Sequence, residues 1–287
     1  MPMSKPNYLK TRIFLDSGNP EDTKQAQITL GFLDGQTTNP SLVMKNPHIQ
    51  ELKTKGELNV NNIWKDYQEV AETIKSVIPG GSVSVEVYAD NATTEEVMYV
   101  QAKELSSWFP GVFVKVPATT VGLKVAEKLV SEGINVNVTL CFSQEQAAAV
   151  HMATKNGKGL VYVSPFIGRL DDVGQNGIDL IDNIVRMYKE WGSHVAVLGA
   201  SIRNLDHMFG CFQRNADIVT IPFSIIQSWK EYGFEKNPQE HIQTISDLTP
   251  IAYKSLQEEN WELYDIKHSL TDKGIEKFVA DWKSLLS

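Results

Sequence analysis

The chain has 287 residues, of which 42% are hydrophobic and 22% charged, a composition typical of a globular protein and too apolar for a disordered one. Its 27 Lys and Arg against 35 Asp and Glu give a net charge of −8, which argues against a nucleic-acid-binding protein or a protein of anionic membrane surfaces. The first residues contain no apolar core of signal-peptide length, no apolar stretch approaches about 18 residues, and there are two cysteines. We therefore expect a soluble, cytoplasmic protein without a membrane span or a disulfide framework.

Eight short segments rich in β-branched residues alternate with longer segments of helical periodicity. The predicted strands are residues 13–16, 30–38, 82–89, 112–118, 136–142, 160–166, 194–201 and 218–223. Most are apolar on both alternating faces, which is typical of a parallel sheet covered on both sides. This pattern predicts the α/β class, with a single (β/α)₈ TIM barrel domain over residues 1–287 and an additional C-terminal helix. A doubly wound sheet is the weaker alternative, because no GxGxxG motif follows an early strand.

Several helix ends can also be predicted. Thr93 with Glu96, and Ser143 with Gln146, have the spacing of a capping box. Two helices are expected to stop at glycines, and a last helix is expected after a threonine cap. These positions are Gly133, Gly157 and Thr271, with Ile275, Phe278, Val279, Trp282 and Leu286 forming the last helix's apolar stripe. Residues 45–62 and 233–269 exceed a minimal barrel, and we expect solvated helices or loops there.

Functional residues of a (β/α)₈ barrel lie at the carboxyl ends of its strands. Polar residues predicted at those ends are Asp16, Thr37, Thr38, Asn39, Glu86, Lys115, Asn137, Thr139, Ser164, Arg169, Ser201 and Arg203. Lys115 is the most informative, since it interrupts an otherwise apolar strand. A lysine that loses solvation becomes a better nucleophile toward a ketone, which suggests Schiff-base chemistry. The alternative is a purely structural ion pair of Lys115 with Glu86 or Asp16.

The remaining polar residues suggest a substrate site. Asp16 and Glu86 are two carboxylates on different strands, as acid–base steps at an imine require. Asn39, Asn137, Thr139 and Ser164 could orient a polyol. Arg169 and Arg203, with Ser201 beside the second, could bind a phosphate. Alternatively, Arg169 pairs with Asp171 or Asp172 and Arg203 is a surface charge.

Scattered histidines and two isolated cysteines predict no metal site. The aromatic residues Trp64, Tyr67, Phe278 and Trp282 follow helical spacing and are expected in the core.

Six motifs together resemble the transaldolase family. They are TTNPS (37–41), VKVPAT (114–119), GINVNVTLCFSQEQA (133–147), SPFIGRLDD (164–172), GASIRN (199–204) and HSLTDKGIEKFVADW (268–282). They occur in the family's order, and the last is similar to the C-terminal helix of its shorter members. The resemblance implies that Lys115 forms a Schiff base, that Asp16 is the acid–base group at the sugar C4 hydroxyl, and that Glu86 acts through a water with Thr139.

The resemblance also implies the substrate contacts and the reaction. Asn39 and Asn137 would hold a dihydroxyacetone unit, with Thr38, Ser164 and Phe166 near it, and Arg169, Ser201 and Arg203 would bind the phosphate. The implied enzyme transfers this unit from fructose 6-phosphate or sedoheptulose 7-phosphate to an aldose phosphate, in the non-oxidative pentose phosphate pathway, without metal or organic cofactor. The family forms dimers and larger rings, so a homo-oligomer is expected.

Three alternatives to this function remain. The first is an aldolase of the fructose 6-phosphate type, whose members typically have Gln at the position of Glu86 and Tyr at that of Phe166. The second is a transaldolase for another anionic ketose, such as a sulfonated sugar. The third is a non-catalytic sugar-phosphate-binding relative.

Overall fold

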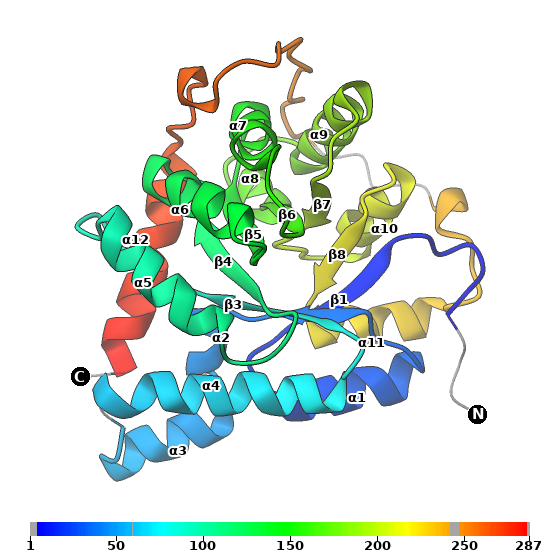
Figure 1. Cartoon of the computed structure of the whole chain (residues 1–287). Helices are drawn as coiled ribbons and strands as arrows, with labels where there is room; N and C mark the ends of the chain where they lie inside the picture. The colour runs from blue at the N-terminus through cyan, green and yellow to red at the C-terminus, as the bar shows by residue number, and fades with distance from the viewer. Residues whose placement is uncertain (1–4, 59, 242–246, 286–287) are drawn as a thin grey trace.

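Eight parallel strands close into a barrel in the computed structural model, which describes residues 5–58, 60–241 and 247–285 (Figure 1). The strands are β1 (Arg12–Asp16), β2 (Gly35–Thr37), β3 (Ser82–Glu86), β4 (Phe113–Pro117), β5 (Asn135–Cys141), β6 (Val161–Pro165), β7 (Ala196–Gly199) and β8 (Ile218–Ile221). They follow one another in chain order, and β1 pairs with β8 to complete the ring. The predicted (β/α)₈ barrel with an added C-terminal helix is confirmed.

Helices surround the barrel and cover its outer face (Figure 1). They are α1 (Pro20–Leu30), α2 (Pro40–Met44), α3 (Pro47–Lys55), α4 (Val60–Val77), α5 (Glu95–Ser106), α6 (Thr120–Ser131), α7 (Gln144–Thr154), α8 (Ile167–Asp171), α9 (Gly177–Trp191), α10 (Leu205–Gln213), α11 (Phe223–Tyr232) and α12 (Ser269–Leu285), with the 3₁₀ turns η1 (Pro238–Glu240) and η2 (Trp261–Leu263). Val114 and Val116 of β4 are fully buried beneath this layer, as alternating outward residues of a covered strand should be.

The second strand is shorter than predicted. Residues 30–38 were expected to be extended, but Leu30 is the last residue of α1 and the strand begins at Gly35. Gly31 has φ 74°, and its left-handed conformation ends the helix. The apolar residues between Gly31 and the strand belong to a loop rather than to the sheet.

Three helix ends differ from the predictions. Thr94, not Thr93, caps α5, because the Thr93 hydroxyl donates to Asp90 in the preceding turn. The last helix begins at Ser269, and Thr271 inside it donates to the carbonyl of Leu140. Gly157 has no left-handed backbone, whereas Gly133 does, with φ 83°. A Cβ at Gly157 would lie 2.1 Å from a methyl of Val130, so close packing explains that glycine.

Other predicted features are confirmed. Ser143 caps α7 by accepting from the Gln146 amide. Tyr67, Phe278 and Trp282 are buried, and Trp64 is partly buried against them. The expected apolar residue Leu286 lies outside the described part of the chain.

Aromatic side chains fill the amino-terminal end of the barrel. The rings of Phe113 and Tyr162 stack with centroids 4.1 Å apart, and Phe14 meets Tyr162 edge-on. The Arg12 guanidinium lies over the Tyr162 ring and donates to its hydroxyl at 3.1 Å. Because this end is closed by packed rings, the polar interior of the barrel lies at the carboxyl end.

The two segments beyond the minimal barrel lie on its periphery. Residues 47–55 form α3, on the outer side of α4 (Figure 1). The segment from 247 to 268 runs along α7 and α9, where Gln144 donates to the Lys254 carbonyl at 2.7 Å and Asn183 to the Ile251 carbonyl at 2.9 Å. These two side-chain amides hydrogen-bond the irregular segment to the helix layer.

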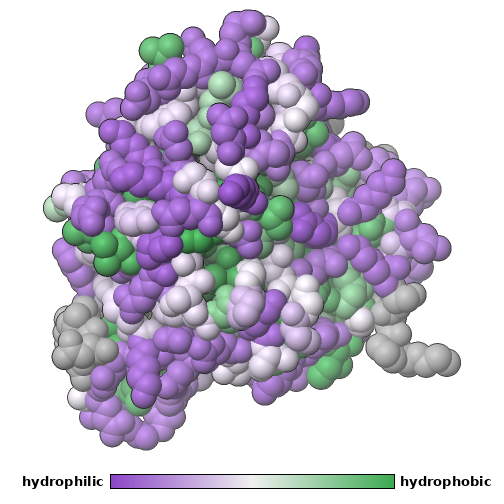
Figure 2. All heavy atoms as spheres, in the orientation of Figure 1, coloured by the Kyte–Doolittle hydropathy of each residue, from purple (hydrophilic) through white to green (hydrophobic). Residues whose placement is uncertain are grey.

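The face of the molecule in Figure 2 is largely hydrophilic, with small apolar patches between polar residues. Among the described helices, none combines the length and apolar character that a bilayer span requires.

Candidate active site

A cavity of about 360 Å³ opens at the carboxyl end of the barrel. Ten of the thirteen residues predicted for the site line it: Asp16, Thr37, Asn39, Lys115, Thr139, Ser164, Phe166, Arg169, Ser201 and Arg203. The other three, Thr38, Glu86 and Asn137, lie immediately behind this lining and hydrogen-bond or ion-pair with residues around it. The structure therefore brings together residues that are up to 187 positions apart, from Asp16 to Arg203.

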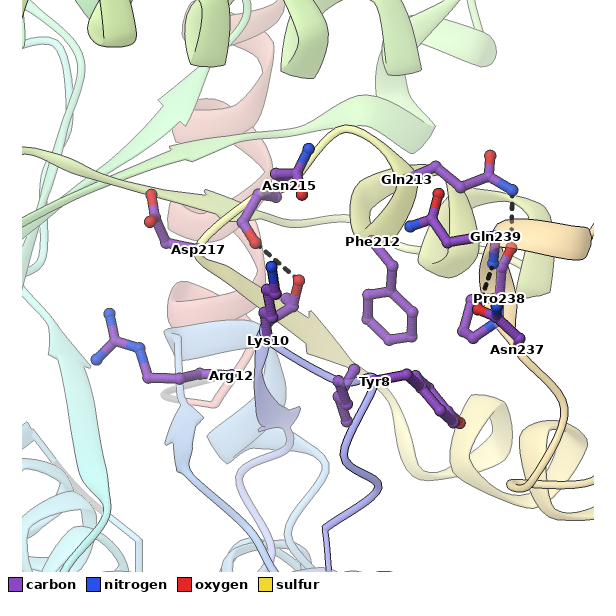
Figure 3. A pocket seen from close by; sticks show the side chains of 13 residues that line it. Tyr8, Lys10, Arg12, Phe212, Gln213, Asn215, Asp217, Asn237, Pro238 and Gln239 are labelled. Atoms are coloured by element: carbon purple, nitrogen blue, oxygen red, sulfur yellow. Dashed lines mark hydrogen bonds between the residues drawn. The ribbon is translucent and has the colours of Figure 1, made fainter.

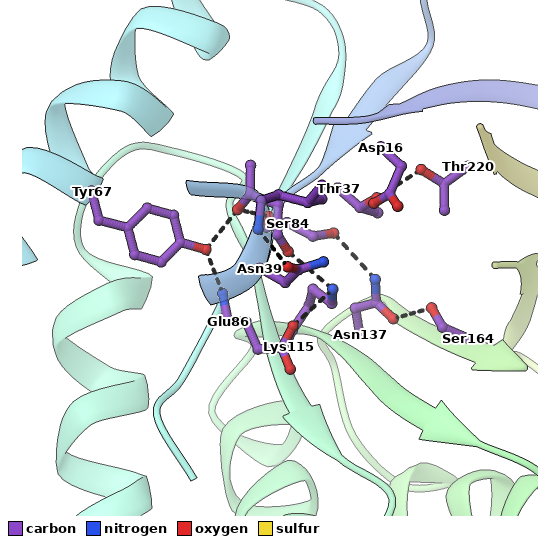
Figure 4. Close-up of polar contacts among 12 residues, drawn as sticks. Asp16, Thr37, Asn39, Tyr67, Ser84, Glu86, Lys115, Asn137, Ser164 and Thr220 are labelled. Carbon is purple, nitrogen blue, oxygen red and sulfur yellow. Dashed lines mark hydrogen bonds and ion pairs between the residues drawn. The ribbon is translucent and has the colours of Figure 1, made fainter. Parts of the chain in front are cut away.

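Lys115 lies in the middle of this arrangement and is 3% exposed. Its Nζ is 2.9 Å from Glu86 Oε2 and donates to the Thr38 carbonyl at 3.0 Å (Figure 4). The sheet register explains the contact with Glu86, because Glu86 and Lys115 are direct partners on β3 and β4. Removing one member of such a buried pair leaves the other charge without compensation. The sequence left open whether Glu86 or Asp16 pairs with the lysine, and the structure selects Glu86.

Both carboxylates of the site are shifted toward the protonated form. Burial raises the pKa of Glu86, and the nearby Lys115 ammonium opposes this shift. Burial likewise raises the pKa of Asp16, opposed by Lys115, by a hydrogen bond from Thr37 and by Lys45. A carboxyl group whose pKa is raised is a stronger base than an exposed carboxylate, which favours acid–base catalysis.

Asp16 is held by neighbouring strands. The Thr37 hydroxyl donates to Asp16 Oδ1 at 2.7 Å and lies 2.6 Å from the Thr220 hydroxyl. Since the Thr37 proton points to the carboxylate, Thr220 donates to Thr37. This chain across β1, β2 and β8 orients the carboxylate toward the cavity without neutralising it.

The uncharged residues form a second connected group. The Ser164 hydroxyl donates to Asn137 Oδ1 at 2.7 Å, and Asn137 Nδ2 donates to the Ser84 hydroxyl at 3.3 Å (Figure 4). Asn39 caps α2 by accepting from the Leu42 amide at 2.9 Å, and its side chain also lines the cavity. These bonds fix the amide orientations, so each amide presents a defined donor or acceptor.

Thr139 lies at a distortion of β5. Its hydroxyl is fully buried and has no protein hydrogen-bond partner within the described residues. The next residue, Leu140, has φ 56°, and the pairing of β5 with β6 shifts register between Val138 and Cys141. A bulge of this kind re-aims side chains and is common beside active sites. Thr139 itself shares the inner face of β5 with Asn137, two residues earlier, and lines the cavity just before the bulge.

Two arginines line the mouth of the cavity. The Arg169 guanidinium lies between the rings of Phe166 and Phe278, 5.3 and 5.5 Å from their centroids. Arg203, whose side chain is 51% exposed, forms an ion pair of 2.9 Å with Asp172, and the charge of Asp172 also acts on Arg169. Asp171, the other alternative partner, lies 2.8 Å from His207. Burial lowers the pKa of Arg169, although a guanidinium remains charged at neutral pH.

The backbone of the cavity wall is strained at Ser201. Ser201, between the two arginines in the cavity wall, has φ 59°, a conformation that non-glycine residues rarely adopt. Such strain persists only where the surroundings enforce it, and it concentrates at functional sites.

Sequence reasoning missed several residues of this cavity. Lys45, which follows α2, and Lys277 of α12 add two more cations to its lining, and Phe278 is both a core residue and part of the wall. Lys277 precedes Phe278 in the C-terminal motif, but helical spacing alone indicated only that Phe278 is buried. The packing of α12 against α2 and β5 brings both residues to the site.

No three His, Cys, Asp or Glu side chains of the described ranges are grouped as metal ligands. The expectation that the chemistry needs no metal stays a prediction.

A second cavity, of about 640 Å³, lies at the opposite end of the barrel between β1 and α10 (Figure 3). Its polar side chains contact loop carbonyls, as when Gln213 donates to the Pro238 carbonyl at 2.8 Å. Among the described residues of its lining, none forms a buried ion pair comparable with that of Lys115 and Glu86. The carboxyl-end cavity is therefore the candidate active site.

Comparison with known proteins agrees with this geometry. The family model described as transaldolase/fructose-6-phosphate aldolase matches residues 13–287. A probable transaldolase of Dehalococcoides mccartyi is 36% identical over 274 residues, covering 96% of this chain and 99% of the relative. A probable transaldolase of Methanococcus vannielii is 36% identical over 275 residues, with 96% and 99% covered, and one of Agathobacter rectalis is 35% identical over 274 residues, with 96% and 98% covered. The family model covers nearly the whole chain, and the barrel contains a buried lysine–glutamate pair at a cavity lined by two arginines. The chain therefore belongs to the transaldolase/fructose-6-phosphate aldolase family.

Proposed function

We propose that this protein is a transaldolase that transfers a dihydroxyacetone unit between sugar phosphates through a Schiff base on Lys115. The observation that carries the proposal is the contact of the buried Lys115 amine with Glu86 at 2.9 Å, in a cavity with an arginine-lined mouth. Attack on a ketone requires the lysine to give up a proton, and Glu86 is the nearest acceptor. Its raised pKa makes it a stronger base than an exposed glutamate.

The steps follow from this arrangement. Lys115 Nζ adds to C2 of the ketose, and the carbinolamine loses water with proton transfer from Glu86, through a water molecule held by Thr139. The resulting iminium accepts the electron pair of the C3–C4 bond as that bond breaks, while Asp16 takes the proton of the C4 hydroxyl. An aldose phosphate leaves, and a three-carbon enamine remains on Lys115. Addition of a second aldose phosphate reverses these steps.

The charge distribution supports an anionic ketose as donor. The cavity lining carries Arg169 and Arg203, with Lys45 and Lys277 in addition, and Asp172 is already paired with Arg203. Guanidinium groups bind phosphate oxygens in pairs, which suits a terminal phosphate. A sulfonate offers the same oxygens, so a sulfonated ketose is the second candidate donor.

Retention of the enamine separates a transferase from an aldolase. Aldolases of the family typically have Gln at the position of Glu86 and Tyr at the position of Phe166. The resemblance at these two positions therefore favours a transaldolase. In the structure Phe166 packs against Arg169 and Phe142 and brings no hydroxyl to the cavity. An apolar wall here disfavours hydrolysis of the enamine.

Borohydride trapping with fructose 6-phosphate, followed by peptide mapping, tests the proposal. We expect a three-carbon adduct on Lys115 that an added aldose phosphate depletes. An adduct that decays equally fast without an acceptor would indicate an aldolase. If no adduct forms with phosphorylated or sulfonated ketoses, the Schiff-base mechanism is wrong.

The proposed reaction places the enzyme in the non-oxidative pentose phosphate pathway of the cytoplasm. We also propose that residues 1–287 act as one domain and that the protein assembles as a homo-oligomer.

A further inference from the structure

Tyr67 joins the site from outside the barrel. It belongs to α4, is fully buried, and packs edge-on against Trp108 with centroids 5.3 Å apart. Its hydroxyl lies 2.6 Å from Thr38 Oγ1 and accepts from the Glu86 backbone N–H at 3.0 Å. Figure 4 shows the ring reaching from the helix layer to the ends of β2 and β3.

The direction of each hydrogen bond in this group is determined. Thr38 Oγ1 donates to the Ser84 carbonyl at 2.8 Å, because a carbonyl can only accept. The Thr38 hydroxyl has one proton, so toward Tyr67 it can only accept, and the Tyr67 hydroxyl donates to it. Burial raises the pKa of Tyr67, so the phenol keeps the proton that this bond requires.

Tyr67 also replaces a bond of the sheet. In a parallel ladder, the Thr38 amide donating to the Ser84 carbonyl would be followed by the Glu86 amide donating to the Thr38 carbonyl. Here the Glu86 amide donates to Tyr67 instead, and the Thr38 carbonyl accepts from Lys115 Nζ at 3.0 Å. The Tyr67 hydroxyl thus replaces the Thr38 carbonyl as the acceptor for the Glu86 amide, and the Thr38 carbonyl remains available to Lys115.

We propose that Tyr67 is a positioning residue for imine formation: its hydroxyl ends the β2–β3 ladder and so holds the Thr38 carbonyl and Glu86 against the Lys115 amine. The inference rests on the proposed function, since it assigns a role only if Lys115 forms the Schiff base. Tyr67 is not one of the residues that line the active-site cavity, and it acts through Thr38 and Glu86, which contact the amine.

The test is the Tyr67→Phe variant, which removes a single oxygen atom. Without the hydroxyl, the Glu86 amide returns to the Thr38 carbonyl and competes with Lys115 for it. We expect kcat, and the rate of adduct formation under borohydride, to fall about tenfold, the equivalent of about 1.4 kcal/mol. KM for the donor should change by less than about twofold, because the substrate contacts remain.

Tyr188→Phe is the matched control. Tyr188 is another buried tyrosine, whose hydroxyl donates to the Ala147 carbonyl at 2.7 Å in the helix layer, away from the cavity. Tyr188→Phe, which loses one buried hydrogen bond, should melt roughly 2–4 °C lower, and Tyr67→Phe, which loses two, should melt lower by at least as much. Only Tyr67→Phe should lose kcat.

The outcomes separate the two proposals. If the wild type forms the borohydride-trapped adduct, and Tyr67→Phe has the same kcat and the same rate of adduct formation, the positioning role alone is overturned. Equal losses of kcat in both variants also overturn it, because they would reflect stability. Absence of an adduct in the wild type overturns the Schiff-base mechanism, and the positioning role with it.

Discussion

Lys115 carries the proposed chemistry, and its substitution gives the most direct test. Lys115→Ala should abolish turnover, with a loss of more than about 1,000-fold, because the other two lysines of the lining, Lys45 and Lys277, are exposed and have no part in the buried contact with Glu86. Lys115→Arg is the control for charge, since it keeps a cation beside Glu86 but cannot form a Schiff base. Both variants should retain the circular dichroism of a folded barrel, although Lys115→Ala should melt lower because Glu86 loses its partner. Activity in either variant would refute the mechanism.

Asp16 should show a conflict between function and stability. Its pKa is raised in the fold by burial, so the native state binds this proton more tightly than the unfolded chain does. Deprotonation above the ordinary aspartate pKa of about 3.9 therefore costs native stability. Asp16→Asn removes this cost, and we expect it to abolish activity while raising Tm by roughly 2–4 °C at pH 7.

The stability gain of Asp16→Asn should depend on pH. It should vanish as the pH falls below about 4, where the carboxyl is protonated in both the folded and the unfolded protein. Thermal melts across pH 3 to 8 measure it, with Glu104→Gln, at an exposed carboxylate of α5, as the control. A Tm gain that persists at low pH would mean that burial of this charge is not its cause.

Arg203 should act on donor binding rather than on the chemical step. Arg203→Ala removes one guanidinium from the cavity mouth, and we expect KM for a phosphorylated donor to rise by about tenfold or more. Arg186→Ala is the control, because that exposed arginine pairs with Glu190 one helical turn away. Steady-state kinetics decide the matter, and an unchanged KM would place the phosphate elsewhere.

At the level of elements, α12 is both the cover of the barrel and a wall of the site. It packs on α2 and β5, and the Ser41 hydroxyl donates to Asp281 across the first of these contacts. The close approach requires Gly274, where a Cβ would lie 2.6 Å from a Leu140 methyl and 2.8 Å from Arg169 Nη1. The position of this helix and that of the Arg169 guanidinium are therefore coupled.

Gly274→Ala tests this coupling. Alanine favours a helix over glycine by about 1 kcal/mol, but here its methyl must displace Leu140 or Arg169. We expect KM for the donor to rise about threefold or more, with kcat changed less. Lys273→Ala, at the neighbouring exposed position on α12, is the control and should leave KM unchanged. Equal kinetics in the two variants would show that α12 and the arginine move independently.

At the scale of the whole molecule, the C-terminal helix packs over the barrel of its own chain. It contacts α2 and β5 and contributes Lys277 and Phe278 to the lining of the candidate site. We therefore expect specific activity to stay constant within about twofold as the protein is diluted through the dissociation of the proposed oligomer. Assays paired with sedimentation at the same concentrations measure this. Activity lost in parallel with dissociation would mean that the subunits depend on one another.

The sequence by itself determined the barrel and the residues around its carboxyl end. Apolar runs of strand length, separated by amphipathic helices, leave few topologies, because parallel strands need crossover helices on their covered faces. Lys115 was recognisable as a site residue because a charge inside an apolar strand is costly unless it is paired or functional. Such signals lie within a few consecutive residues, so they can be recognised without knowledge of the fold.

Only the tertiary structure decided which side chains meet. Thr38, Tyr67, Glu86 and Lys115 are far apart in the chain, and periodicity assigned Tyr67 to the core without indicating that its hydroxyl bonds two strand ends. Helix ends were misplaced for the same reason, as at Thr271, whose hydroxyl donates to a carbonyl of β5. Periodicity reports the face on which a residue lies. Hydrogen-bond partners depend on distances between elements, and these are set only when the whole barrel packs together.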